Sequence, residues 1–500
     1  MNRLSALACA AVFAIAASLF ALANATKGLD VSAQFVGAIP TTVYKKPGDQ
    51  TRPVIIIAHG FAGSQQFMQP LAVTLARNGF IAVTFDFAGH GRNPEPLHGG
   101  LADLPRSTQT LLEQLDQMFG FASALPQADG RLGAVGHSMA ADLVVRYAAA
   151  HPEIGAVVAV SLFGTEATPQ KPMNLLVIDG AWESDGLKRA GYRVVDAAAR
   201  GIAQEGVTYG DLARGSARRF ALAPNVEHIG VLYSATALHE TLAWMNGAFG
   251  RDEVGFIDRR GPWLLLLFLG LVALAEPASR LLPVLEPEPL GAGLPWRRVW
   301  PLCLATALLT PFLTWILPTR FLPLPIADYL VTHFAVYACL TCVGLLWLKA
   351  HAVPPSALCK SAFIAATVGC AAYYVFAMGT PIPLYVTAVA PTFARLPYLA
   401  ILLPAVAAYC IADAWATRRV VGAYLFSKFC FLVSLGIAVA LEPRRLFFLI
   451  VITPAMLLLF SIFWRVGALA YRRVNDPRPG ALGEALALAL ALAAVFPMMD

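Results

Sequence analysis

Residues 132–145 read Leu-Gly-Ala-Val-Gly-His-Ser-Met-Ala-Ala-Asp-Leu-Val-Val, an apolar run, a turn and a helical pattern in direct succession. The apolar run 132–135 is predicted to be a strand, and residues 139–150 are predicted to be a helix. Between them, residues 136–140 place a serine on a sharp, strained turn that holds its hydroxyl clear of the sheet. The glycine and alanine two positions either side are small, as the close approach of strand and helix requires. Ser138 is therefore the candidate nucleophile.

Short apolar runs alternate with helical patterns on both sides of this turn. Such alternation predicts an α/β domain with a parallel sheet that is covered on both sides. Continuous β-branched runs are typical of strands buried on both faces. The further predicted strands are 54–58, 80–85, 156–161, 174–178 and 220–222; the further predicted helices are 64–78 and 107–119, and 185–215 is less regular.

The composition excludes a wholly soluble chain. Of 500 residues, 58% are hydrophobic and 14% are charged, whereas about 25% of a soluble domain is charged. The apolar excess lies at residues 1–25 and from residue 262 onward. The net charge of +6 comes without a basic run or interleaved aromatic and basic residues, so no nucleic-acid partner is expected. None of the eight cysteines lies in the α/β stretch, which therefore has no disulfide framework or zinc site.

The second half is predicted to be an all-α membrane domain, residues 262–498, of about eight transmembrane helices. Each apolar segment is near the roughly 20 residues that cross a bilayer. The segments are 262–283, 298–317, 326–348, 360–379, 396–416, 421–441, 446–467 and 480–498. Residues 1–25 combine a charged start, an apolar centre and a small-x-small ending, which indicates a cleaved signal peptide or a retained N-terminal anchor.

The loop charges predict which side of the membrane each part faces. If the α/β domain is exported, eleven Lys or Arg residues lie in cytoplasmic loops and four in outside loops. Lys and Arg accumulate on the cytoplasmic side, so the charges and the N-terminal segment agree. We expect an integral protein of a bacterial inner membrane, with the α/β domain on the periplasmic or extracellular side. The eleven are Arg280, Arg297, Arg298, Lys349, Lys360, Arg418, Arg419, Arg465, Arg472, Arg473 and Arg478; the four are Arg320, Arg395, Arg444 and Arg445.

Two further motifs follow predicted strands. Residues 59–63 read His-Gly-Phe-Ala-Gly, and residues 86–92 read Asp-Phe-Ala-Gly-His-Gly-Arg. With the serine turn, their order and spacing resemble the α/β-hydrolase superfamily of serine hydrolases and esterases, over roughly residues 30–250. The resemblance implies an oxyanion hole formed by the backbone amides of Phe61 and Met139. It implies no more than a structural turn for 86–92 and a loop anchor for His59.

The family's chain order is serine, acid, histidine. By that resemblance the acid lies on the loop after the run 175–178, commonly three residues after a glycine, which selects Glu183. Asp185 is the alternative acid, and Asp179 a weaker one. His228, on a loop after the last predicted strand, is the implied base; His239 falls within a predicted helix.

The resemblance implies hydrolysis of an ester or related acyl bond through an acyl-enzyme, without a metal or organic cofactor. The expected partners are a small-molecule or lipid-like acyl substrate and membrane lipid, and the sequence identifies no protein partner. An amidase or peptidase uses the same residues. A different class is a transporter or signalling protein whose hydrolase-like domain is an inactive sensor. Within the spans, His333, Asp413 and Lys428 are functional candidates by default, but their positions favour a structural role. Asp413 lies close to the end of its helix, Lys428 can pair with it or extend to the surface, and His333 lies near an outside end. The membrane half is therefore expected to anchor the hydrolase beside lipid or to deliver a lipid-like substrate.

Overall fold

The computed structural model describes residues 3–164, 167–199, 201–252, 255–351 and 359–500. The chain divides into two compact units. The sheet unit comprises Ser18–Leu265 with two short segments from the second half, Leu384–Ala388 and Pro497–Asp500. The helical unit comprises Met1–Ala17, Leu266–Pro383 and Val389–Phe496.

The sheet unit is built on a nine-stranded sheet in the order β1-β2-β4-β3-β5-β6-β7-β9-β8. The six strands from β4 to β9 are parallel. The direction of strand addition reverses between β3 and β5, the point at which such sheets form their sites. The strands are β1 Asp30–Val36, β2 Ile39–Lys45, β3 Arg52–Ala58, β4 Ile81–Phe85, β5 Ala128–His137, β6 Ile154–Val160, β7 Leu175–Gly180, β8 Thr208–Tyr209 and β9 Arg218–Ala223.

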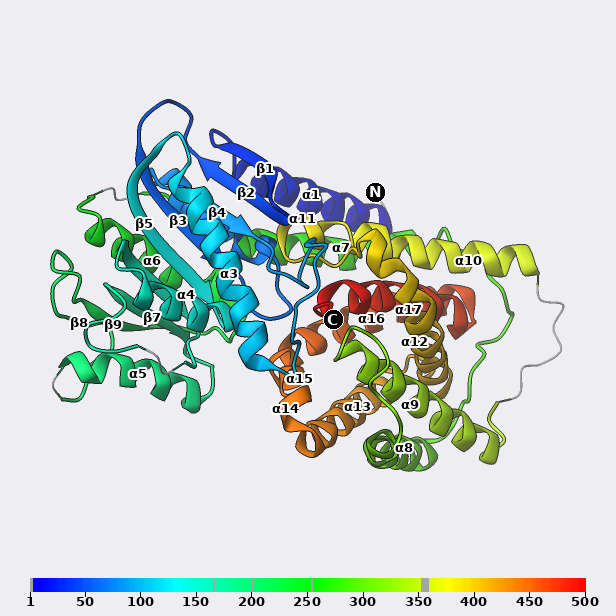
Figure 1. Ribbon diagram of the computed structural model, residues 1–500. Coiled ribbons are helices and arrows are strands. Elements are labelled where there is room, and N and C mark those ends of the chain that lie inside the picture. Colours follow the sequence, from blue (N-terminus) through cyan, green and yellow to red (C-terminus); the bar gives the residue numbers. More distant parts are fainter. Residues whose placement is uncertain (1–2, 165–166, 200, 253–254, 352–358) are drawn as a thin grey trace. The chain divides into compact units, whose positions relative to one another are not determined.

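Helices cover both faces of this sheet (Figure 1). Alternate residues of β3 enter different cores: Val54 and Ile56 pack with α3, α4 and α5, whereas Ile55 and Ile57 pack with α2 and α6. A strand buried on both faces in this way reads as a continuous β-branched run. The helices are α2 Gln69–Arg77, α3 Leu104–Ser123, α4 Met139–Ala150, α5 Asp185–Ala199 and α6 Ala235–Ala248, with 3-10 turns η1 Gln65–Met68 and η2 Gly230–Tyr233.

The predicted α/β fold class is confirmed, and the structure corrects it at the sheet's edges. Strands β1, β2 and β8 pair antiparallel with their neighbours. The hairpin 30–45 escaped prediction because β1 is exposed along almost its whole length and carries no burial pattern. Helix α5 occupies the start of the stretch 185–215, which was predicted to be less regular.

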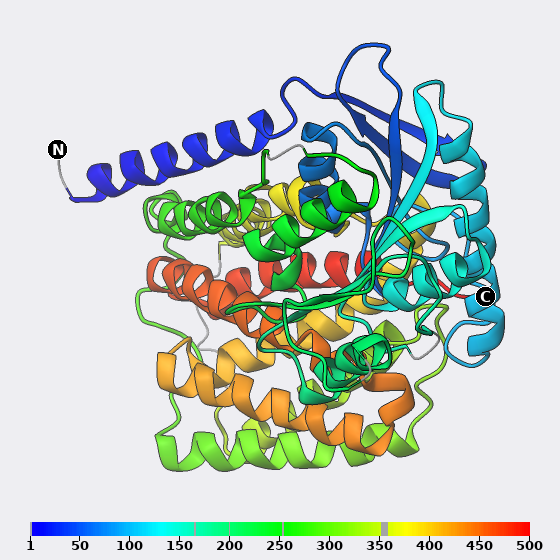
Figure 2. The same ribbon diagram turned by 90° about the vertical axis from the view of Figure 1, so that its left-hand side faces the viewer.

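The helical unit consists of long apolar helices that lie side by side (Figures 1 and 2). Among the described residues, nine helical segments of the chain are long and apolar enough to cross a membrane, which indicates an integral membrane protein. They are α1 Arg3–Asn24, α7 Arg260–Ser279, α8 Trp296–Ile316, α9 Ala327–Trp347, Lys360–Tyr385, Phe393–Thr417, α13 Val421–Leu441, α16 Thr453–Val474 and α17 Pro477–Val495.

Two of these segments are compound, and shorter helices complete the unit. The fifth joins α10 Lys360–Ala372, the π-helix η3 Tyr373–Met378 and α11 Pro381–Tyr385, and the sixth joins the 3-10 turn η4 Phe393–Arg395 to α12 Leu396–Thr417. The remaining helices are α14 Pro443–Leu446 and α15 Phe448–Val451. The two readings of residues 1–25, the domain boundaries and the sidedness stay predictions.

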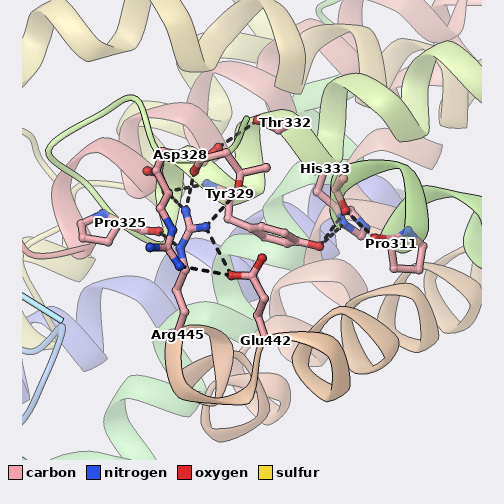
Figure 3. A network of polar contacts seen from close by, with 11 residues as sticks. Pro311, Pro325, Asp328, Tyr329, Thr332, His333, Glu442 and Arg445 are labelled. Carbon is pink, nitrogen blue, oxygen red and sulfur yellow. Dashed lines mark hydrogen bonds and ion pairs between the residues drawn. The ribbon is translucent and has the colours of Figure 1, made fainter. Parts of the chain in front are cut away.

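Two of the four positive residues predicted on the outside are buried and used as hydrogen-bond donors. Arg395 Nη1 donates to the carbonyl oxygens of Ala493, Ala494 and Phe496 at 2.7–3.1 Å, and so caps the end of α17. Arg445 donates to a turn before α9 and to the first turn of that helix (Figure 3).

Candidate active site

Ser138 lies on a strained turn between β5 and α4. Its backbone adopts φ 55° and ψ −117°, a combination that costs energy and persists where the surrounding structure enforces it. Its amide donates to the carbonyl oxygen of Val160 on β6 at 2.8 Å. A Cβ at Gly136 would collide with the carbonyl of Ala140. The small residues of the motif are thus a steric requirement of the turn.

The structure brings Ser138, His228 and Glu183 together from three separate loops. His228 Nε2 lies 2.9 Å from Ser138 Oγ, and His228 Nδ1 lies 2.5 Å from Glu183 Oε1. A carboxylate only accepts hydrogen bonds, so Nδ1 carries the ring proton. Nε2 is then an acceptor for the hydroxyl proton of Ser138.

Of the three candidate acids, only Glu183 contacts the imidazole. Its second oxygen accepts the amide of Gly180 at 2.7 Å, which fixes the carboxylate. The Asp185 side chain is 80% exposed and pairs with Lys188 at 3.0 Å. Asp179 is fully buried at the end of β7 and does not reach the histidine loop by a hydrogen bond.

The loop that carries His228 is held at both ends. The Glu227 carboxylate accepts the amides of Ile229 and Gly230 at 2.7 and 2.9 Å. A Cβ on Gly180 would lie 2.5 Å from the carbonyl oxygen of Val226. The glycine three residues before the acid therefore lets the acid loop and the histidine loop approach each other.

The His-Gly-Phe loop after β3 lies against the nucleophile. A Cβ on Gly60 would lie 2.9 Å from Ser138 Cβ, so only a glycine allows this approach. Phe61 follows in the loop, and Met139 opens helix α4, where first-turn amides lack partners within the helix. His59 anchors the loop: Nδ1 lies 2.8 Å from the Gly60 carbonyl oxygen, and Nε2 accepts the Phe87 amide at 3.1 Å.

Residues 86–92 form the structural turn that the resemblance implies. The Asp86 carboxylate accepts the amides of Gln65 and Arg92 at 2.8 and 3.0 Å. Gly91 packs directly on that carboxylate, where a Cβ would collide. The turn supports the loop after β3 and has no place in the serine–histidine–glutamate relay.

His137 is a positioning residue that the sequence argument missed. Its ring is buried, and Nε2 lies 2.9 Å from the carbonyl oxygen of His228. Burial, followed by the neighbouring His228, lowers the pKa of His137 to about 3. The ring is therefore neutral and donates from Nε2 to the carbonyl oxygen of His228, which ties the backbone of the His228 loop to the end of strand β5. The sequence signal that could have identified His137 is its place in the motif, as a polar residue between Gly136 and Ser138.

Two buried polar side chains lie behind the acid. Strands β6 and β7 pair with Val160 opposite Ile178. Ser161 and Asp179 are the next residues along the chain from these two, so they lie at neighbouring positions. Neither the Asp179 carboxyl nor Ser161 Oγ has a hydrogen-bond partner among the described residues. Burial first, and the adjacent Glu183 second, raise the pKa of Asp179 to about 8. Asp179 is therefore largely protonated at neutral pH.

Replacing Asp179 by asparagine should stabilise the sheet unit increasingly as the pH rises. The folded pKa of this acid lies above its unfolded value of about 3.9, so folded Asp179 holds its proton where the unfolded chain loses it. Stability falls between about pH 4 and pH 8 by up to about 1.4 kcal/mol per pH unit. An asparagine side chain has no such proton to lose. Thermal unfolding of the full chain in detergent at pH 5, 6.5 and 8 should show a widening gap between variant and wild type.

Asp185→Asn is the matched control for that experiment, because Asp185 is an exposed acid of the same loop. This control should show no gain that grows with pH. A constant difference between Asp179→Asn and wild type from pH 5 to pH 8 would contradict the raised pKa.

Comparison with known proteins agrees with the fold. Residues 49–181 match the family model described as serine aminopeptidase, S33. Among solved structures, a putative dienelactone hydrolase from Klebsiella pneumoniae is 16% identical, over 45% of this chain and 99% of that one, with a TM-score of 0.33. The dienelactone hydrolase of Anabaena variabilis is also 16% identical, over 44% and 97%, with a TM-score of 0.32.

The matched region, residues 49–181, is an α/β-hydrolase domain. It is followed by long apolar helices of membrane-spanning character. The fold and the family match together indicate a hydrolase. The TM-scores lie below 0.5, so the reaction is inferred from the site and not from these structures.

Proposed function

We propose that this protein is a membrane-bound serine hydrolase that cleaves an ester or related acyl bond through an acyl-enzyme. Ser138 is the nucleophile, His228 the base and Glu183 the acid of the triad. One observation carries the proposal: a continuous hydrogen-bonded relay from Ser138 through His228 to Glu183, which begins at a strained strand-to-helix turn.

Each group has a role that its position supports. His228 removes the Ser138 proton as Oγ attacks the acyl carbon, and then gives it to the leaving group. Glu183 holds the imidazole in the tautomer with a proton on Nδ1 and stabilises the cation that forms. The amides of Phe61 and Met139 donate to the oxyanion. Water then attacks the acyl-enzyme with His228 again as base.

The surroundings of the site favour an apolar acyl group. Phe163 and Trp182 follow β6 and β7, the next two strands of the sheet after β5, at the same carboxyl edge that carries Ser138. Their side chains are 54% and 67% exposed. Exposed aromatic rings at the edge of the sheet that carries a nucleophile supply contact area for an apolar chain. With a membrane attached, a lipid-like ester outside the cytoplasm is the substrate class that fits best.

A fluorophosphonate probe applied to isolated membranes tests the proposal. Wild type should be labelled on Ser138, and Ser138→Ala should not. Ser161→Ala is the matched control, because Ser161 is also a serine with positive φ (60°) directly after a strand of the same sheet. That variant should label normally.

The bond class is tested with p-nitrophenyl esters of increasing acyl length beside aminoacyl p-nitroanilides. Faster cleavage of the longer esters is expected, and preferential cleavage of the anilides would make the protein a peptidase. An unlabelled, intact wild-type chain would instead favour a hydrolase-like domain without activity.

A further inference from the structure

Four helices of the helical unit enclose a row of polar side chains. Helix α9 packs on α8 and α12, and α13 packs on α8. Anchoring a domain to a membrane needs only one spanning helix. It does not need polar side chains buried between helices. Buried side chains recur at every fourth residue of α9, which places them on one face of the helix. These are Tyr329, His333, Tyr337 and Thr341, over a rise of about 18 Å.

The first half of the row is a hydrogen-bonded chain. The Tyr329 hydroxyl lies 3.0 Å from Thr314 Oγ1 of α8 and 3.3 Å from His333 Nδ1. His333 Nε2 lies 3.1 Å from Ser434 Oγ of α13. In Figure 3 the Tyr329 ring extends from the first turn of α9 toward His333. Both ring nitrogens of this buried histidine thus have partners that exchange protons.

The end of the row at Tyr329 adjoins a polar entrance. Asp328 Oδ1 accepts Arg445 Nη2 at 2.6 Å, and Glu442 lies 3.6 Å from Arg445 Nη1 (Figure 3). Arg320, whose side chain is 78% exposed, pairs with Glu442 at 3.9 Å. Charged groups therefore lead from the surface of the unit to Tyr329.

The second half of the row contains a buried ion pair. Lys428 Nζ lies 2.9 Å from Asp413 Oδ2, and both side chains are 4–5% exposed. Lys428 also donates to the Tyr409 hydroxyl at 2.8 Å, and Ser427 donates to Asp413 at 2.5 Å. Of the two options that the sequence leaves for Lys428, the structure shows pairing.

A cavity of about 10 Å³ lies beside this pair, lined by Leu302, Cys303, Tyr337, Thr341, Tyr409, Asp413, Ala416 and Ser427. That volume accommodates one water molecule, which needs two to four polar partners. The Tyr337 hydroxyl is buried and has no hydrogen-bond partner among the described residues. A water molecule in this cavity would form hydrogen bonds with the Tyr337 hydroxyl and with Asp413.

Phe431 of α13 packs beside the junction of the two halves, where the His333 and Tyr337 rings face each other at a centroid distance of 6.3 Å. Its fully buried ring has centroid distances of 5.6 Å to His333, 5.4 Å to Tyr337 and 4.9 Å to Tyr409. This apolar ring offers no hydrogen bond with which to join His333 to Tyr337. The row is polar on both sides of the junction.

We propose that the helical unit transfers protons across the membrane along this row, with His333 and Asp413 as the proton-accepting groups and Phe431 as the barrier. His333 takes a proton on its unprotonated ring nitrogen and releases one from the other. The cavity water accepts a proton from the His333 half of the row as it gives one to Asp413, which loses its charge beside Lys428. The ion pair is restored when Asp413 releases that proton to the opposite side.

Protons fit this row better than larger ions. The cavity holds a single water, and no group of three or more metal-ligating side chains occurs among the described residues. The Lys428 ammonium also repels a bound cation. Packing alone does not require these charges, because a buried ion pair can often be replaced by apolar residues without loss of stability. Ionisable groups inside a membrane commonly mark proton relays.

The test is proton uptake by liposomes that contain the purified full chain and the pH-sensitive dye pyranine. A valinomycin-mediated potassium diffusion potential drives the flux. Wild type should conduct protons above the rate of protein-free liposomes. His333→Gln leaves both charges of the ion pair in place and should lower the flux at least about tenfold. Asp413→Asn/Lys428→Met removes both charges together and should do the same. It leaves no unpaired ammonium to oppose folding.

Glu276→Gln is the matched control, since it breaks a half-exposed ion pair with Arg465 away from the row, and it should conduct like the wild type. Phe431→Ala should conduct faster. The proposal is overturned if wild-type flux equals that of protein-free liposomes, or if either His333→Gln or the double variant conducts like the wild type. A Phe431→Ala variant that is no faster overturns the barrier.

Discussion

Replacing His228 by alanine is expected to slow fluorophosphonate labelling of Ser138 by about 10²- to 10⁴-fold at pH 7.5. The variant keeps the nucleophile but loses the group that removes its proton, and general bases contribute on that scale. Glu183→Gln should cost about as much, for a different reason. A glutamine can donate its amide hydrogen to Nδ1 of His228, which moves the ring proton to Nε2 and leaves Ser138 without an acceptor.

The measurement is the pseudo-first-order labelling rate across a series of probe concentrations, with the unlabelled chain checked for folding by size-exclusion chromatography. Asp185→Asn is the control, since Asp185 pairs with Lys188 at the surface and not with His228. It should stay within about twofold of wild type. A large loss in Asp185→Asn with little loss in Glu183→Gln would transfer the acid's role to Asp185, and equal losses would contradict the assignment to Glu183 alone.

Removing one partner of the Arg419–Glu484 ion pair should destabilise the helical unit by about 3–5 kcal/mol, because the other charge is left buried and unpaired. Arg419 Nη2 lies 2.5 Å from Glu484 Oε2, and the side chains are only 2% and 3% exposed. Gly467 of α16 packs on the guanidinium, where a Cβ would lie 2.9 Å from Arg419 Cζ. Water therefore has little room to replace the lost carboxylate.

Thermal unfolding of Glu484→Ala in detergent should show this loss as a large fall in melting temperature. Glu276→Ala breaks the more exposed pair with Arg465, whose side chains are 35–37% exposed, and should cost less than about 1 kcal/mol. Removing both charges in Arg419→Met/Glu484→Leu should recover most of the stability. Similar melting temperatures for Glu484→Ala and Glu276→Ala would show that breaking the buried Arg419–Glu484 pair costs no more stability than breaking the exposed pair.

The parts of the site that were predictable are those set by short-range steric rules. A nucleophile on a strand-to-helix turn requires small residues two positions away, and a carboxylate loop that approaches another backbone requires a glycine. Both demands act within a few residues of Ser138 and Glu183, so both are visible in the sequence. The resemblance preferred Glu183 to Asp185 by its spacing from Gly180, and the distances to His228 show that Glu183 is the acid that contacts the imidazole.

The missed features depend on partners distant in the chain. His137 acts through the carbonyl of His228, 91 residues away. Asp179 and Ser161 become neighbours only through the pairing of β6 with β7. In the helical unit, the hydrophobicity that predicts the spans hides which face of each helix is buried. The polar row of α9 becomes recognisable once α8, α12 and α13 enclose it.

The sequence by itself determined the α/β class of the first half, the strand-to-helix turn at Ser138 and the apolar helices of the second half. These follow from local periodicity, local sterics and the apolar length that a bilayer demands. The loops of Glu183 and His228 were indicated by the family resemblance. Only the tertiary structure decided which acid meets the imidazole, which polar groups are buried without partners, and how Asp413, Lys428 and His333 are shared among four helices. Those outcomes depend on distances between residues far apart in the chain, which no local pattern encodes.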